Sequence, residues 1–419
     1  MTTGGVTMLR ADRQGICLSV AFLRDAEWLT LTRVNAYASA MIVFSAAIII
    51  WALSGKGIDD PAGRAVGTDF VSFWTVSWTL LNGHPDAVYF PAALAAAEQA
   101  VVPRIKTAFY AWQYPPIALL AVYPLAVLPY LWALGVWLVA GLACYLTALW
   151  RILPHPQTLW AGLGFPAALL TITHGQNAFL TTALLAWGLL LLRGRPFSAG
   201  ILIGLLSFKP QLGVLLPVAL IAGGHWRAIA AAALTVLTLS ALTIVLFGSN
   251  VWYEFIGSTR FTYTMLDAGL VPYFKLQSAF AAMRLLGADP AIAYAAQGFI
   301  AAGAAASVAW IWRSSGDPDI MRASVLAATP LATPFLGDYD LLLLAPAIAR
   351  TVRSRVRCSA LPWEGVTFAA ATLVTLVARP VAEYTHILLT PVAAAGLLAV
   401  IIARSRRLRK NHAVPDHRI

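Results

Sequence analysis

The chain contains little charge, which excludes a soluble protein, and little cysteine, which argues against a protein held together by disulfides or zinc. Only 11% of its 419 residues are charged, whereas 60% are hydrophobic. So much apolar sequence predicts an all-α protein that crosses a membrane many times, because helices satisfy their own backbone groups in lipid. The three cysteines, Cys17, Cys144 and Cys358, lack metal-ligand spacing, so neither a disulfide framework nor a zinc site is indicated.

The basic residues lie mostly between the apolar runs, where they indicate membrane topology rather than nucleic-acid binding. The formal charge is +11. If residues 1–33 are a cytoplasmic N-terminal segment, most of the 29 Lys and Arg fall on the cytoplasmic side, as the positive-inside rule expects. We therefore predict a single membrane domain over residues 34–403 and a disordered, basic cytoplasmic tail over residues 404–419.

Twelve apolar runs are candidate membrane spans. They are Val34–Leu53, Leu131–Trp150, Leu159–Thr173, Ala178–Leu192, Phe197–Phe208, Leu212–Gly223, Ala228–Phe247, Ala291–Trp312, Ala323–Phe335, Leu341–Arg350, Thr367–Ala378 and Ile387–Ala403. Several are shorter than the roughly 20 residues that a straight span needs, so we expect their ends to extend into the flanking motifs. This topology leaves two long extracytoplasmic loops, which begin after the first and the seventh of these runs.

The two loops are predicted to carry amphipathic helices at the membrane interface. Residues 70–81, 94–102 and 274–286 have suitable spacing, with aromatic anchors at Phe73, Trp74 and Trp78 in the first of them. The apolar run at residues 114–129 contains four prolines. We predict that this run is re-entrant or lies at the interface rather than crossing the membrane.

Four polar motifs cannot be explained by composition. They contain Asp69; His174, Gln176 and Asn177; Lys209 and Gln211; and Asp338 and Asp340. In the predicted topology all four emerge at the extracytoplasmic ends of different spans, which indicates a shared cavity. Two alternatives remain open: Asp69 also suits the N-cap of the helix predicted over residues 70–81, and Lys209 also suits a lysine that snorkels to the interface.

With these motifs in this order, the chain resembles the polyprenyl-phosphate-sugar-dependent mannosyltransferases of glycosyltransferase family 87, membrane enzymes of the GT-C superfamily. The resemblance covers about residues 67–345. It rests on GTDFVSFWTVSWTLLNGHPDAVY (67–89), YPPIALLAVYPLAVLP (114–129), HGQNAFLTTALLA (174–186), SFKPQLGVLLP (207–217), KLQSAFAAMRLLG (275–287) and TPFLGDYDLLLLAPA (333–347). Family members often carry a His shortly after the proline of the last motif, and this chain has none there.

The resemblance implies a GT-C-like fold and inverting transfer of a sugar, expected to be mannose, from a polyprenyl phosphate to a lipid or glycan hydroxyl. Asp69 matches the family's catalytic carboxylate and would act as the general base. Lys209, helped by Arg260 or Lys275, would bind the donor phosphate. The residues that would bind sugar or acceptor are His174, Gln176, Asn177, Gln211, Asp338 and Asp340. Neither a metal nor another cofactor is expected.

Two other functions fit a polytopic membrane protein. A secondary transporter would place polar groups at mid-membrane in broken helices, often with an internal repeat, and neither is visible in the sequence. A flippase or polymerase for lipid-linked glycans would also use basic residues against lipid phosphate. We expect a multi-pass protein of a bacterial inner membrane whose active site faces outward.

Overall fold

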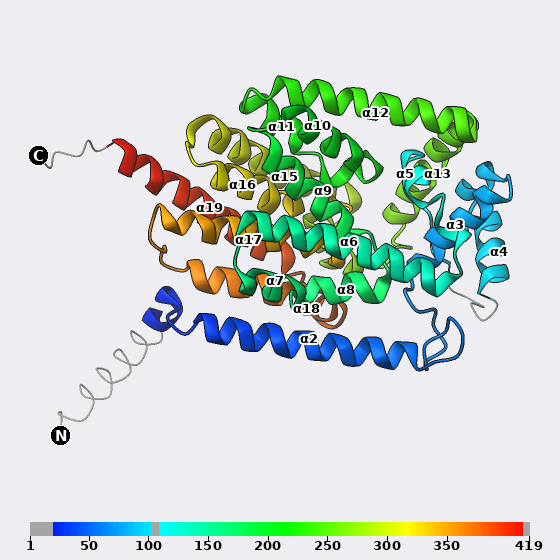
Figure 1. Ribbon diagram of the computed structural model, residues 1–419, viewed down its shortest axis with the longest axis horizontal. Coiled ribbons are helices and arrows are strands. Elements are labelled where there is room, and N and C mark those ends of the chain that lie inside the picture. Colours follow the sequence, from blue (N-terminus) through cyan, green and yellow to red (C-terminus); the bar gives the residue numbers. More distant parts are fainter. Residues whose placement is uncertain (1–19, 103–108, 414–419) are drawn as a thin grey trace, which may run out of the picture.

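The structure, a computed structural model, describes residues 20–102 and 109–413. Over these residues every regular element is a helix, and β-pairing is limited to two isolated bridges. The long helices lie roughly along the longest axis of the molecule (Figure 1). Five of them are long and apolar enough to cross a membrane: α2 (Leu31–Leu53), α6 (Tyr130–Ile152), α12 (Trp226–Phe247), α15 (Pro290–Ser314) and α18 (Glu364–Thr385). The predicted all-α membrane fold is confirmed.

The other predicted spans coincide with shorter helices or with the last helix of the chain. These are α7 (Pro156–Leu163), α8 (Pro166–His174), α9 (Ala178–Leu191), α10 (Pro196–Leu205), α11 (Leu216–Ala222), α16 (Pro318–Ala332), α17 (Leu344–Arg353) and α19 (Thr390–Ala413). The run predicted as one span over residues 159–173 is divided into α7 and α8. The division falls at Pro166, which has no backbone N–H to continue a helix and is well placed in the first turn of the next one.

Several of the shorter helices end inside the bundle rather than at its surface. Helices α9, α10 and α16 have 14, 10 and 15 residues. They are therefore about 21, 15 and 22 Å long, less than the roughly 30 Å of a hydrocarbon core. Short 3₁₀ turns, η3 (Leu206–Phe208), η4 (Pro210–Leu212) and η6 (Asp338–Leu343), lie where helices end. Irregular backbone at membrane depth is tolerated where protein covers it or where it lines a cavity.

The two predicted loops form short helices and 3₁₀ turns, together with one longer helix. They are α3 (Phe70–Leu81), η1 (Pro85–Tyr89), α4 (Pro91–Val101), α5 (Ile117–Val122), η2 (Leu125–Val127), α13 (Asn250–Asp267), η5 (Tyr273–Lys275) and α14 (Ala279–Leu285). Figure 1 shows α3, α4, α5 and α13 at the end opposite the start of α2 and the end of α19. Helix α5 has six residues, and with η2 it forms a short apolar stretch over Ile117–Val127, so the re-entrant or interfacial placement of this run stays a prediction. Helix α13 was not predicted.

Helix α3 is part of the core and not an interface helix. Nine of its twelve residues are buried. Phe73, predicted as a membrane anchor, is 1% exposed and packs edge-on against Trp112, Tyr114 and Trp137. Of the three predicted anchors only Trp78 is substantially exposed. The prediction failed because the helical spacing shows an apolar face but does not show which neighbours cover it.

The predicted tail begins too early. Helix α19 continues to Ala413. Arg404 is fully buried, and its guanidinium lies 2.6 Å from the carboxylate of Glu364 in α18. Residues 404–408 therefore pack within the folded bundle. Residues 1–19 and 414–419 lie outside the described part of the chain.

Candidate active site

Two glycine-containing loops place Asp69 against the end of α8. Gly67 and Gly175 both have positive φ, +72° and +65°, which glycine adopts without strain. A Cβ atom on Gly175 would lie 2.6 Å from the Cβ of Phe70, so the loops approach too closely for any other residue. The backbone N–H of Asp69 donates to the carbonyl of His174 at 2.9 Å. Asp69 and the polar residues after α8 therefore lie side by side although they are more than 100 residues apart.

The carboxylate of Asp69 does not cap α3. Asp69 occupies the N-cap position, but its side chain makes no capping hydrogen bond. Instead its Oδ2 accepts a hydrogen bond from Nε2 of Gln176 at 2.8 Å. The side chain is partly exposed. The capping alternative is therefore wrong for the side chain, and the carboxylate belongs to the polar cluster.

A continuous series of side-chain hydrogen bonds runs from Asp69 into the bundle. The Tyr114 hydroxyl donates to Oε1 of Gln176 at 3.2 Å and accepts from Nδ2 of Asn177 at 3.0 Å. Oδ1 of Asn177 accepts from the ammonium of Lys209 at 3.2 Å. Burial raises the pKa of Tyr114, so its hydroxyl stays protonated and remains a donor. Every amide and hydroxyl in the series has a partner, and such fully satisfied networks fix the positions of their members.

Lys209 is buried and paired. Its side chain is 3% exposed, and its Nζ lies 2.6 Å from Oδ1 of Asp340, which is 2% exposed. The other oxygen of Asp340 accepts the backbone N–H of Gly337 at 3.1 Å. The ammonium also lies 4.9 Å from the ring centre of Tyr339. Lys209 therefore does not snorkel to the interface. It lies between η3 and η4, and its side chain is buried inside the protein.

A second group of side chains adjoins this pair on the side of α18. Nη1 of Arg379 lies 3.3 Å from Oδ2 of Asp338 and 3.2 Å from Nε2 of His174. A guanidinium can only donate, so Nε2 of His174 is the acceptor and carries no proton. Nδ1 then carries the ring proton and donates to the carbonyl of Leu170 at 2.8 Å. His174 is thus neutral and held on both sides, an arrangement that suits positioning better than proton transfer.

The structure gathers seven of the ten predicted site residues, which are Asp69, His174, Gln176, Asn177, Lys209, Asp338 and Asp340. The other three lie apart. Arg260 is exposed on α13. Lys275 is exposed at the edge of the cluster, next to Leu276, which forms a β-bridge with Gly337.

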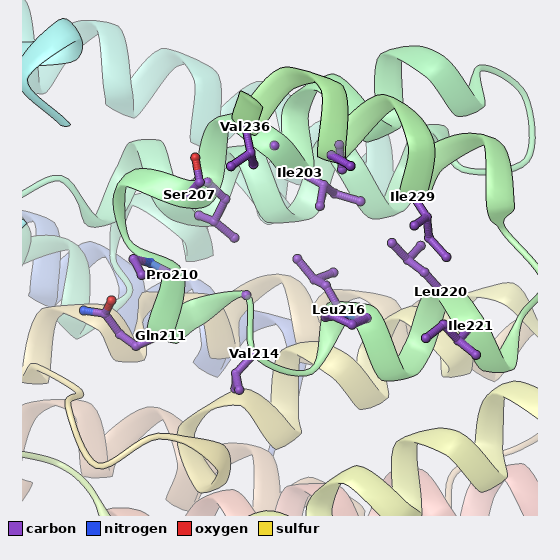
Figure 2. A pocket seen from close by; sticks show the side chains of 16 residues that line it. Ile203, Ser207, Pro210, Gln211, Val214, Leu216, Leu220, Ile221, Ile229 and Val236 are labelled. Atoms are coloured by element: carbon purple, nitrogen blue, oxygen red, sulfur yellow. The ribbon is translucent and has the colours of Figure 1, made fainter. Parts of the chain in front are cut away.

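Gln211 faces a different part of the molecule. It lines an apolar groove of about 640 Å³ between η4, α11 and α12. Figure 2 shows Ser207 and Gln211 at one end of this groove and Leu220 and Ile229 at the other. The groove contains none of the gathered side chains, so it is separate from the polar cluster.

Three members of the cluster were not predicted: Tyr114, Tyr339 and Arg379. Tyr114 is the first residue of the motif at residues 114–129, and its position beside two prolines was the only sequence feature that could have indicated a role in the site. Arg379 lies within the apolar sequence of α18, where it was treated as a topology marker. Its charge alone, inside a membrane span, is a signal of function.

A model of glycosyltransferase family 87 matches residues 112–334, more than half of the chain. The chain belongs to glycosyltransferase family 87. The predicted family is thereby confirmed, and a GT-C-like polytopic fold is consistent with it. Neither the curated proteins nor the solved structures contain a match to this glycosyltransferase.

The matched segment of the family 87 enzyme includes part of the cluster: Tyr114, His174, Gln176, Asn177 and Lys209. The carboxylates and Arg379 lie outside it. Their place in the site therefore rests on the contacts described above. Membership of the family makes the chain a membrane glycosyltransferase, which requires a sugar donor and an acceptor.

Proposed function

We propose that this family 87 glycosyltransferase transfers a sugar, with mannose as the expected one, from a polyprenyl phosphate to a hydroxyl of a lipid or glycan. The reaction would take place at the extracytoplasmic face of a bacterial inner membrane. One observation carries the proposal. Asp69 is partly exposed and forms no ion pair among the described residues, whereas Asp338 and Asp340 each have a cation.

In the proposed reaction the acceptor hydroxyl attacks the anomeric carbon of the donor while Asp69 takes the hydroxyl proton. The bond between the anomeric carbon and the phosphate oxygen breaks, and the phosphate leaves with the electron pair as a polyprenyl monophosphate. Attack from the side opposite the leaving group inverts the configuration. A positioned general base contributes typically ~10²–10⁴-fold to the rate. The departing phosphate gains a negative charge, which a nearby cation would stabilise.

The surrounding residues support this role of Asp69. Gln176 holds one carboxylate oxygen, and Tyr114 holds Gln176 in turn. Lys209 and Asp340 neutralise each other at the inner end of the series. We therefore propose that Lys209 acts mainly by fixing Asn177 and Asp340, and that sugar hydroxyls bind at the open side of the cluster near Asp69.

The test is Asp69→Asn. Asn has nearly the same size and can still accept from Gln176, and α3 loses no cap because the side chain makes no capping bond. The variant should fold normally, while transfer should fall by ~10²-fold or more. The matched control is Asp86→Asn, which changes an exposed carboxylate of the same predicted loop.

The assay compares the lipids of a deletion strain that expresses each form at equal protein level. The glycolipid missing from the deletion strain should return with the wild type and with Asp86→Asn but not with Asp69→Asn. Turnover of a polyprenyl-phosphate mannose by purified protein, with that glycolipid's precursor as acceptor, then gives the rate. Wild-type turnover by Asp69→Asn would remove Asp69 as the base.

A further inference from the structure

Arg379 is the only cation in α18, whose 22 residues are apolar enough to cross a membrane. A charged side chain in a membrane span is costly and is retained where it serves a function. The Arg379 side chain is 32% exposed, in contrast to the buried Lys209. It is therefore both held by the protein and open on one side.

The described residues engage only one nitrogen of Arg379. Nη1 makes both contacts, to Nε2 of His174 and to Oδ2 of Asp338. Nη2 and Nε have no acceptor among the described residues. These two nitrogens form one edge of the guanidinium, which matches two oxygens of a phosphate group.

The neighbouring cations do not offer the same edge. The ammonium of Lys209 is enclosed by Asp340 and Asn177. All three nitrogens of Arg284, on α14, are bonded: Nε to Tyr273, Nη1 to the carbonyl of Ala288 and Nη2 to that of Asp267. Arg260 and Lys275 are exposed on the loop elements and form no hydrogen bond or ion pair with the described residues of the cluster. Of the two described cations that are bonded to the cluster, Lys209 and Arg379, Arg379 is thus the one with free donors.

We infer that Arg379 binds the phosphate of the lipid donor through Nη2 and Nε, with His174 and Asp338 as the positioning residues that fix its orientation. The inference rests on the proposed function, which supplies the phosphate, and it assigns the phosphate contact to a residue of α18 in place of Lys209. His174 accepts a hydrogen bond from Arg379 with its unprotonated nitrogen, and the carboxylate of Asp338 balances the charge of Arg379 when no phosphate is bound. When the phosphate leaves the sugar it gains a negative charge, and the guanidinium edge offers two donors to it.

The experiment measures binding of two probes by the purified full-length protein in detergent. Farnesyl phosphate carries the phosphate and a short isoprenoid chain, and farnesol carries the chain alone. The wild type should bind farnesyl phosphate more tightly than farnesol. Arg379→Gln should weaken farnesyl phosphate binding about 10–100-fold, the effect of losing charge-assisted hydrogen bonds, and leave farnesol binding unchanged.

Two further variants separate phosphate binding from folding. Arg322→Gln removes a partly buried arginine of α16 that bonds the carbonyl of Leu190, and it should keep the wild-type preference. Arg379→Lys keeps the charge but loses the two parallel N–H donors of the guanidinium, so the preference for farnesyl phosphate over farnesol should fall severalfold. If Arg379→Gln does not fold, Arg379→Lys tests whether Arg379 binds the phosphate. A melting temperature measured for each variant shows whether it is folded.

The outcomes distinguish this inference from the proposed function. An unchanged preference in folded Arg379→Gln, or in Arg379→Lys, overturns the inference and leaves the proposed function standing. Equal binding of farnesyl phosphate and farnesol by the wild type overturns both. Asp69→Asn should keep the preference for farnesyl phosphate while losing turnover, so that failure of the base and failure of the phosphate contact give different results.

Discussion

The buried ion pair of Lys209 and Asp340 allows a direct test of what holds the site together. The two side chains are 3% and 2% exposed, and the charged atoms are 2.6 Å apart. Lys209→Met leaves a buried carboxylate without a cation, and Asp340→Asn leaves a buried ammonium that faces only neutral oxygens. We expect each single change to lower the free energy of unfolding by about 3–5 kcal/mol, because an uncompensated charge remains in the interior.

The double variant carries neither charge. It should lose only about 1–2 kcal/mol, the cost of the missing hydrogen bonds, and so should be more stable than either single variant. The difference between the double loss and the sum of the single losses measures the coupling between the two residues. The exposed pair Arg24 and Asp25, 2.8 Å apart, is the matched control, and neutralising it should leave the stability nearly unchanged because solvent screens both charges.

The assay is unfolding of the purified variants in detergent, titrated with a denaturing detergent and monitored by tryptophan fluorescence. A double variant whose loss equals the sum of the single losses would show that the two charges do not act as a unit. A Lys209→Met protein as stable as the wild type would contradict the burial argument itself. If Lys209→Met is stable but inactive, Lys209 acts on the substrate rather than on the fold.

Two further predictions concern single positions in the loops. Gly175→Ala should lower both the melting temperature and turnover, because the new Cβ at φ +65° would lie 2.6 Å from the Cβ of Phe70; Gly224→Ala, at φ +66° with nothing within 4 Å, should show only the backbone cost of about 1–2 kcal/mol. Burial raises the pKa of Glu98 from 4.5 to about 7, so the folded loop binds this proton more tightly than the unfolded chain, and stability should fall as the pH rises from 4.5 to about 7. Glu98→Gln can still accept from the N–H of Tyr110 and should abolish that part of the fall, which melting temperatures across the same pH range would detect as a flatter slope.

Much of the fold was predictable because apolar runs and prolines act locally. The long helices follow from runs of the required length, and the division at Pro166 follows from the missing N–H. Helix α13 was missed because its apolar and polar residues are mixed and it lies in a predicted loop. The full burial of Arg404 depends on Glu364 from another helix, which no local pattern records.

The site was predictable as a collection of motifs but not as a set of contacts. Asp69, Gln176 and Asn177 stood out because polar groups are rare in this chain. The partner of Lys209 is 131 residues away, so its pairing is decided by the packing of helices. Arg379 was overlooked because a lone arginine in an apolar run has the same appearance whether it marks topology or points into a site.

The hydrogen bonds between Lys209 and Asp69 all run in one direction. Lys209 donates to Asn177, Asn177 to Tyr114, Tyr114 to Gln176, and Gln176 to Oδ2 of Asp69. Oδ1 of Asp69 accepts nothing from the described residues. In the proposed reaction the acceptor hydroxyl would therefore deliver its proton to Oδ1 and approach from the side away from Gln176. If Asp69 is the base, the order of donors in the interior selects the face from which the acceptor enters.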